Sequence, residues 1–568
     1  MMNQRKMTFP ARLAGPTVVT IFFLIALSFQ LFRISGQPDI VNLDHDASVL
    51  ASFAAAMDHP DAFKNDILLS DKMNFQFYNT VHMSVLRTLA PLLDSYGKVF
   101  VAFTGIHVFV FLMGWYLFGM TLMRHHFWAA LLACFLAIPT NLGYNDTWGV
   151  LVAEPLPRIT FDSVLGFLFA AAIRWGHLPQ APFWILSLFG LSITLHPPNA
   201  VLVGLCTWLG LVLRRMQGMT IRAWLIDSAW MGIGFLLMIF IYLFSYHQQI
   251  THIPQGDPVS AYQLEQAAAP HLVDTLPDIL KICTDILENG MFPLAIVAGL
   301  GIYFIGTTEQ RQHLFQVIIW MSAIAAIVLL SILLQQSQWL AIQNLVYLLY
   351  GVHSIRYVFP LLIVLSIWSL SLYWTKFHDT VPTFSLGIGA IVFVLASTGT
   401  LSQAIPLIIS PRQSYWDLLT YYDKRNKGNL FNHEMLNAVK QLTPVSARLL
   451  PLNVDAALIR YGARRSVVHG YWDSSHFSYS NPRANMEWIQ REALVTDVKN
   501  LWNGMDSNDW REQFEIAIDR LLTSLKPDYI VSSRIEPSSI WERSGRKIIW
   551  KNSRFILIDV TESRYGRR

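Results

Sequence analysis

Long apolar blocks are the feature that most constrains how this chain can fold. They run for about 15–25 residues, which is the length that a helix needs to cross a hydrocarbon core of roughly 30 Å. A single segment crosses only as a helix, because a helix satisfies its own backbone hydrogen bonds. A transmembrane barrel would instead show short segments that alternate apolar and polar residues. We therefore expect a polytopic α-helical membrane protein.

The composition agrees with this expectation. Only 14% of the residues are charged and 53% are hydrophobic, whereas soluble domains carry about 25% charged residues. The net charge of +4 is small, and no basic run predicts binding of nucleic acid. The three cysteines, Cys134, Cys206 and Cys283, have no metal-type spacing and predict no disulfide framework. The chain thus lacks the charge to cover a soluble surface of its size.

Eleven blocks fit membrane-crossing helices. They are 13–32, 99–122, 127–142, 159–174, 183–196, 199–213, 224–246, 291–306, 314–335, 356–374 and 384–408. We interpret the first as a retained helix, because it is too long for a typical signal peptide and no small-residue cleavage site follows before Arg33. With a cytoplasmic N-terminus, the short inner loops hold most of the basic residues, as the positive-inside rule requires. The odd count then places the C-terminal segment outside a bacterial-type inner (plasma) membrane, whereas one helix more or fewer would place it in the cytoplasm.

Three segments remain outside the membrane, at about 33–98, 247–290 and 409–568. The first has the spacing of two amphipathic helices that lie along the membrane surface. The last has more charged residues, and its β-rich runs alternate with helical ones, which predicts a small α/β domain. We therefore expect a membrane domain at 1–408, with its first outer loop at 33–98, and an extracytoplasmic domain at 409–568.

The most informative polar segment is Asp44-His45-Asp46, shortly after the first membrane helix. It places two carboxylates at the start of a predicted surface helix, near the outer membrane face. Carboxylates there could act as a general base or hold a cation. Alternatively, one of them simply caps the helix, because Asp is favoured at that position. The two readings are compatible, since the positive end of a helix favours an ionised carboxylate.

This loop resembles that of the GT-C superfamily of membrane glycosyltransferases, in which a long outer loop with an acidic pair follows the first helix. Residues 45–51, HDASVLA, are similar to the Asp-Glu-Ala motif of the protein mannosyltransferase and aminoarabinose transferase branch, with His-Asp where Asp-Glu is usual. Residues 79–97 lie where that branch has its second surface helix. The resemblance covers about the first 400 residues in architecture and about ten in motif.

The resemblance implies an inverting sugar transfer at the outer membrane face. Asp44 or Asp46 would deprotonate the acceptor hydroxyl, and a lipid phosphate would leave. The implied partners are a polyprenyl-linked sugar donor, membrane lipids, and a glycan, lipid or protein acceptor. Members of the superfamily differ in their use of a divalent cation, so an ion bridging Asp44 and Asp46 stays open and no other cofactor is expected.

A leaving phosphate needs cationic or hydrogen-bonding partners. Four residues at the outer helix ends are candidates: Arg158, His196, His353 and Arg356. Each has a structural alternative, such as an interfacial anchor for Arg158, a helix cap for His196 or an ion pair with a nearby acid for Arg356. The candidates for the substrate pocket are His45, Asn145 and Glu154, although loops often carry such polar groups without a specific role.

In the C-terminal segment, several basic residues gather near Tyr461 and Tyr471: Arg460, Arg464, Arg465 and His469. They fit an acceptor-binding surface or, as we prefer, a solvated face.

Two other functions stay open. A transporter or flippase of a lipid-linked substrate would explain the helices, but not the structured first loop or the C-terminal domain. In a non-catalytic assembly protein with the same fold, Asp44 and Asp46 would be dispensable.

Overall fold

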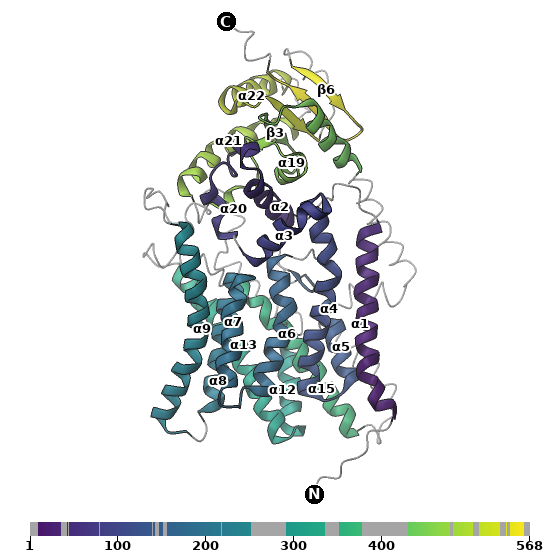
Figure 1. Cartoon of the computed structure of the whole chain (residues 1–568), viewed down its shortest axis with the longest axis vertical. Helices are drawn as coiled ribbons and strands as arrows, with labels where there is room; N and C mark the ends of the chain where they lie inside the picture. The colour runs from purple at the N-terminus through teal and green to yellow at the C-terminus, as the bar shows by residue number, and fades with distance from the viewer. Residues whose placement is uncertain are drawn as a thin grey trace.

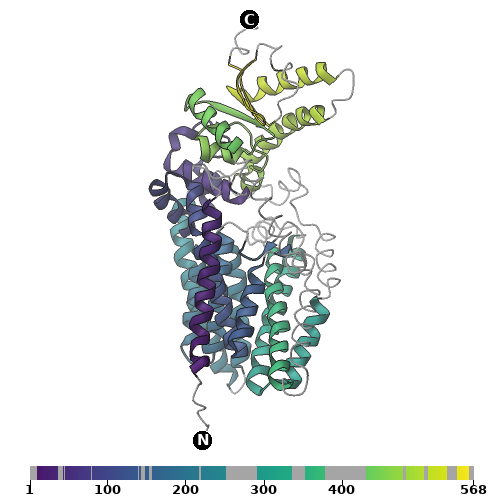
Figure 2. The same cartoon turned by 90° about the vertical axis from the view of Figure 1, so that its right-hand side faces the viewer.

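In a computed structural model of the whole chain, a bundle of long helices carries a smaller α/β body at one end (Figure 1). The structure describes residues 9–35, 43, 45–78, 80–138, 140–141, 147–151, 156–216, 219–250, 291–335, 352–377, 430–477, 481–503, 510–533, 541 and 546–561. The C-terminal body lies at the opposite end of the bundle from the start of the first helix in both views (Figures 1 and 2).

The bundle helices coincide with ten of the eleven predicted spans. They are α1 (Phe9–Ser35), α4 (Tyr96–Met123), α5 (His126–Ala137), α6 (Pro157–Trp175), α7 (Ala181–Leu191), α8 (Pro197–Arg215), α9 (Ile221–Ile250), α12 (Met291–Ile305), α13 (Thr308–Gln335) and α15 (Val358–Phe377). Within the described residues, six segments are long and apolar enough to cross a membrane: Ala14–Leu31, Tyr96–Met123, Pro197–Arg215, Ile221–Ile241, Thr308–Ser331 and Ser354–Lys376. The protein is thus a polytopic helical membrane protein. The span at 384–408 lies outside the described residues, so the count of eleven stays a prediction.

Two sequence features place α6 and α8, which matter for the site. Both helices begin with proline, Pro157 in α6 and Pro197 in α8, whose fixed φ suits the first helical turn. Gly166 brings α6 against α4, because a Cβ there would lie only 2.5 Å from the carbonyl carbon of Gly114. Gly166 thus permits the close approach of the middle of α6 to α4.

The C-terminal domain is a mixed five-stranded sheet with helices against it. The strands are β3 (Arg448–Leu452), β4 (Ser466–Val467), β5 (Tyr529–Ser532), β6 (Lys547–Lys551) and β7 (Ile556–Asp559). Their order is β4-β3-β5-β7-β6, with β3 parallel to β4 and β5, and β7 antiparallel to β5 and β6. The helices are α19 (Ala456–Ala463), α20 (Ser474–Phe477), α21 (Pro482–Asn503) and α22 (Trp510–Leu525). Four of the strands and the two long helices were expected from the sequence, whereas β3 was not.

The first outer loop forms α2 (His45–Asp58), the 3-10 helices η1 (Pro60–Phe63) and η2 (Lys72–Tyr78), and α3 (Val81–Leu93). The prediction that both α-helices lie on the membrane surface is wrong for α2. Its residues from Ala47 to Ala56 are all buried, because α19 of the C-terminal domain packs on it. By contrast, α3 leaves Val81, Val85 and Leu92 exposed, as expected for an amphipathic helix.

The same loop covers the edge of the C-terminal sheet. The Ile67 amide donates to the carbonyl of Val467 in the edge strand β4 at 3.2 Å, and the Val467 amide donates to Asp66 Oδ2 at 2.7 Å. Pairing of this kind protects an edge strand from other chains. The first loop and the C-terminal domain therefore form one continuous body at the end of the bundle (Figures 1 and 2).

Candidate functional site

The site is built around Asp46 and Arg158. Asp46 lies in the first turn of α2, and Arg158 is the second residue of α6. Asp46 Oδ2 lies 3.6 Å from a terminal guanidinium nitrogen of Arg158, and the side chains are 57% and 33% exposed. This distance exceeds that of a hydrogen bond, so the contact is a loose ion pair. Both charged groups can therefore be reached from solvent and can exchange partners.

His196 lies beside this pair, at the N-cap of α8. The positive charges of Arg158 and Arg356 both act on its ring. Arg158 Nε and His196 Nδ1 are buried and have no hydrogen-bond partner among the described residues. Arg158 lies in the first turn of α6 and His196 caps α8, and helix N-termini carry partial positive charge. The arrangement suits an anion such as a phosphate.

Arg356 belongs to a second, buried pair one helical turn further along α6. Arg356, in η5 (Val352–Tyr357), donates to Asp162 Oδ2 at 2.8 Å, and both side chains are only 3% exposed. The Tyr357 hydroxyl donates to Asp162 Oδ1 at 3.0 Å, and the ring of Trp148 lies 5.7 Å from Arg356 Cζ. This is the ion-pair alternative expected for Arg356. A role in binding the donor phosphate would require the pair to open.

The remaining predicted site residues are not placed. Asp44, Asn145 and Glu154 lie outside the described residues, as do the side chains of His45 and His353. The choice between Asp44 and Asp46 as the base thus stays open. Among the residues that the structure describes, no group of three or more His, Cys, Asp or Glu side chains could hold a metal ion.

The prediction of a solvated face holds for Arg464, which is exposed, but is wrong for the other three residues of the basic group in the C-terminal domain. Arg460, Arg465 and His469 are buried, and Arg460 is held between Asp66 and Asp473. Burial opposes the charge of Arg460, but Asp473 and then Asp66 more than reverse this effect and raise its pKa. Arg460 is therefore a structural cation.

Sequence reasoning missed the acidic partners Asp66, Asp162 and Asp473. For Asp162 there was a signal, because an acid inside an apolar helix needs a partner or a function. Asp66 and Asp473 lie in loop segments of ordinary polarity, and nothing in the sequence marks them as buried.

Fold and site together define a polytopic membrane protein in which an acidic residue of the first loop lies beside an arginine at the start of a bundle helix. No model of a protein family matches the chain, and neither does the sequence of any curated protein.

Among solved structures, the chain is similar to ArnT from Cupriavidus metallidurans bound to undecaprenyl phosphate. The identity is 12% and the TM-score 0.38, over 95% of this chain and 97% of that one. It is also similar to the apo state of the same protein, with 11% identity and a TM-score of 0.36, over 96% and 98%.

Proposed function

We propose that this protein is a GT-C-like glycosyltransferase that moves a sugar from a polyprenyl-phosphate donor to an acceptor at the outer face of the membrane. The observation that carries the proposal is the placement of Asp46 3.6 Å from Arg158 in the first turn of α6, whose charge also acts on His196 at the N-cap of α8. A base beside an anion site is what an inverting transfer from a phosphate leaving group requires.

The roles follow from the chemistry of each group. Asp46 accepts the proton of the acceptor hydroxyl while the acceptor oxygen forms a bond to the anomeric carbon. The bond from that carbon to the donor phosphate breaks, and its electron pair leaves with the phosphate oxygen. Arg158, His196 and the two helix N-termini stabilise the charge that develops there.

The position of the site supports a lipid-linked donor. It lies at the outer end of apolar helices such as α8, so a polyprenyl chain can lie against the bundle while its sugar reaches the body above. The charge of the site is at the end of the bundle rather than at its middle, where transporters usually bind their substrates.

The test is to delete the gene in its host and to compare envelope glycans and glycolipids by mass spectrometry. The strain is complemented with wild type, Asp44→Asn, Asp46→Asn or Arg158→Gln, each checked for its level in the membrane. Asp61→Asn is the matched control, because Asp61 is an exposed acid of the same outer loop that pairs only with Lys64 in the structure.

We expect a mass change of one sugar unit on deletion, restored by wild type and Asp61→Asn but not by Asp46→Asn or Arg158→Gln. Loss with Asp44→Asn instead would move the base to Asp44. If all variants restore the glycan pattern, the transferase site is wrong, and the transporter and assembly functions take its place.

A further inference from the structure

Helix α19 of the C-terminal domain packs on α2, the helix that carries Asp46. We propose that this domain sets the position of Asp46, and that Ser48, Asp455 and Arg460 are positioning residues for the site. The inference rests on the proposed function for its meaning in catalysis, but the contacts that carry it are independent of any substrate.

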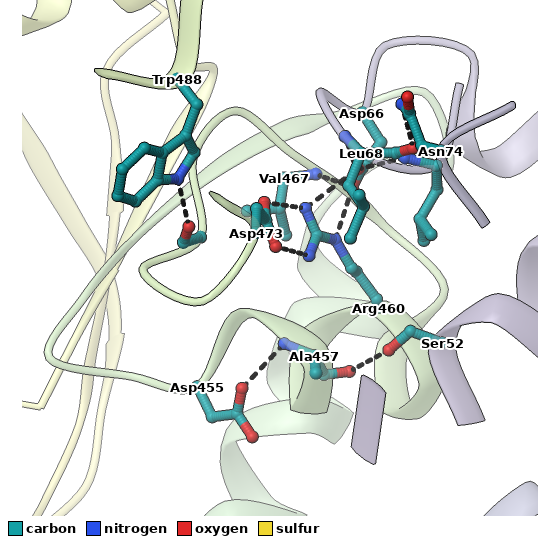
Figure 3. Close-up of polar contacts among 12 residues, drawn as sticks. Ser52, Asp66, Leu68, Asn74, Asp455, Ala457, Arg460, Val467, Asp473 and Trp488 are labelled. Atoms are coloured by element: carbon teal, nitrogen blue, oxygen red, sulfur yellow. Dashed lines mark hydrogen bonds and ion pairs between the residues drawn. The ribbon is translucent and has the colours of Figure 1, made fainter. Parts of the chain in front are cut away.

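The first turns of α2 are tied to α19. Ser48 lies two residues after Asp46, and its hydroxyl donates to Asp455 Oδ2 at 3.1 Å. One turn later, the Ser52 hydroxyl shares its proton between the carbonyl of Ser48 at 2.8 Å and that of Ala457 in α19 at 3.1 Å (Figure 3). Before the helix, the Leu43 amide donates to the Tyr461 hydroxyl at 3.3 Å. Three bonds from one helix of the C-terminal domain thus bracket Asp46.

Arg460 anchors α19 itself to the first loop. Its guanidinium donates to both carboxylate oxygens of Asp66, at 2.9 Å each, and to both of Asp473, at 2.7 and 2.8 Å (Figure 3). Its side chain is 1% exposed. Charge-assisted bidentate bonds of this kind fix orientation as well as distance. Arg460 thereby joins the loop that follows α2 to the C-terminal domain.

Side-chain hydrogen bonds tie α2 to α3 and α4 at its other end. Asp58, the last residue of α2, accepts from Arg87 Nε of α3 at 2.6 Å and from the Tyr96 hydroxyl of α4 at 2.8 Å. Near Asp46 the contact with the bundle is the loose pair with Arg158. An exposed ion pair of this length contributes little to stability. The C-terminal domain is therefore what holds Asp46 in place over α6.

A cross-linking experiment measures this position directly. Asp46→Cys and Arg158→Cys are combined in full-length protein from which Cys134, Cys206 and Cys283 have been removed, and the rate of reaction with a short bifunctional maleimide is followed. Ser48→Ala or Arg460→Gln is then added. Arg520→Gln is the matched control, since Arg520 is an exposed arginine of the same domain. The melting temperature of each variant separates a local shift from general destabilisation.

We expect the cross-linking rate to fall about fivefold in Ser48→Ala, which loses its hydrogen bond to Asp455. The rate should fall further in Arg460→Gln and should not change in Arg520→Gln. If Arg460→Gln has the melting temperature of the control, its cross-linking rate tests the proposal. If Arg460→Gln does not fold, the cross-linking rate of Ser48→Ala tests it. An unchanged rate in the deciding variant overturns the proposal.

The outcome does not depend on the proposed transferase activity, because no donor is present. If the rate falls while Asp46→Asn still restores the glycan pattern in cells, the positioning stands and the proposed function fails. If the rate is unchanged while Asp46→Asn abolishes transfer, the function stands and the positioning fails.

Discussion

At the scale of single residues, exposure separates two ion pairs that lie one turn apart on α6. Asp46 and Arg158 are partly exposed and 3.6 Å apart, so water and ligands compete with their contact. Asp162 and Arg356 are buried and hydrogen-bonded, so neither can lose its partner without a large cost. The first pair is suited to chemistry and the second to holding the helices together.

The loose pair predicts that Asp46 competes with an anion for Arg158. Asp46→Asn should therefore bind a short-chain polyprenyl phosphate more tightly than wild type does, by up to about fivefold, the range of an exposed ion pair. Isothermal titration calorimetry on the purified protein measures this. Arg158→Gln should weaken the same binding, and weaker binding by Asp46→Asn would argue against competition.

The buried pair predicts a large effect on stability. Asp162→Asn removes the carboxylate that pairs with the buried Arg356, which should lower the free energy of unfolding by about 3–5 kcal/mol. The double variant Asp162→Asn with Arg356→Met removes both charges and should be less destabilised than the single one. Denaturant unfolding in detergent measures both. Equal losses in the two variants would show that the charge is not the cause.

At the scale of elements, the sequence predicted the elements whose pattern is local. The apolar face of α22 and the apolar blocks of the bundle are visible in any short window. Strand β3 (Arg448–Leu452) was missed because RLLPL contains proline and no β-branched residue. The burial of α2 was missed because its cover, α19, comes some 400 residues later in the chain. The run of alanine and serine residues in α2 was the one sequence feature that indicated close packing on all sides of this helix.

The site residues likewise divide into those that local sequence predicted and those that it did not. Arg158 and His196 were predicted from their places at helix ends, which depend only on the chain nearby. Their relation to Asp46, and the pairing of Arg356 with Asp162, required the three-dimensional arrangement of four separate elements.

Packing of α21 on the end of β4 predicts acid sensitivity of the C-terminal domain. Burial favours the neutral form of Glu492, but the hydrogen bond with His469 and the charge of Lys499 prevail and lower its pKa below 4.5. The ionised Glu492 therefore stabilises the folded domain fully above pH 4.5. This stabilisation is lost as the pH falls through the lower pKa that Glu492 has in the folded state. The fluorescence of Trp488, which stacks on His469, reports the change. Glu492→Gln should be less stable at neutral pH and less sensitive to acid, and an identical acid transition in both proteins would contradict this.

At the scale of the whole molecule, the start of α1 and the C-terminal body lie at opposite ends of the bundle (Figure 1). Basic residues mark the end away from the C-terminal body. Arg124 follows α4 and pairs with Glu309 at the start of α13, while Arg215 ends α8 and pairs with Asp227. Positive charge at one end of a membrane bundle identifies the cytoplasmic side.

This charge asymmetry predicts a cytoplasmic N-terminus and an outward-facing C-terminal domain, which an odd number of crossings would produce. In spheroplasts of a bacterial host, protease should remove an epitope tag from the C-terminus and leave a tag at the N-terminus intact until the membrane is broken. A cytoplasmic protein that stays intact is the control for leakage. Cleavage of the N-terminal tag alone would invert the topology and place Asp46 and Arg158 on the cytoplasmic side, where an outer-face transfer is impossible. Protection of both tags would mean an even number of crossings with a cytoplasmic C-terminal domain. The structure argues against that outcome, because α1 crosses the bundle between the N-terminus and α2, and α2 is bonded to the C-terminal domain through Ser48 and Ser52.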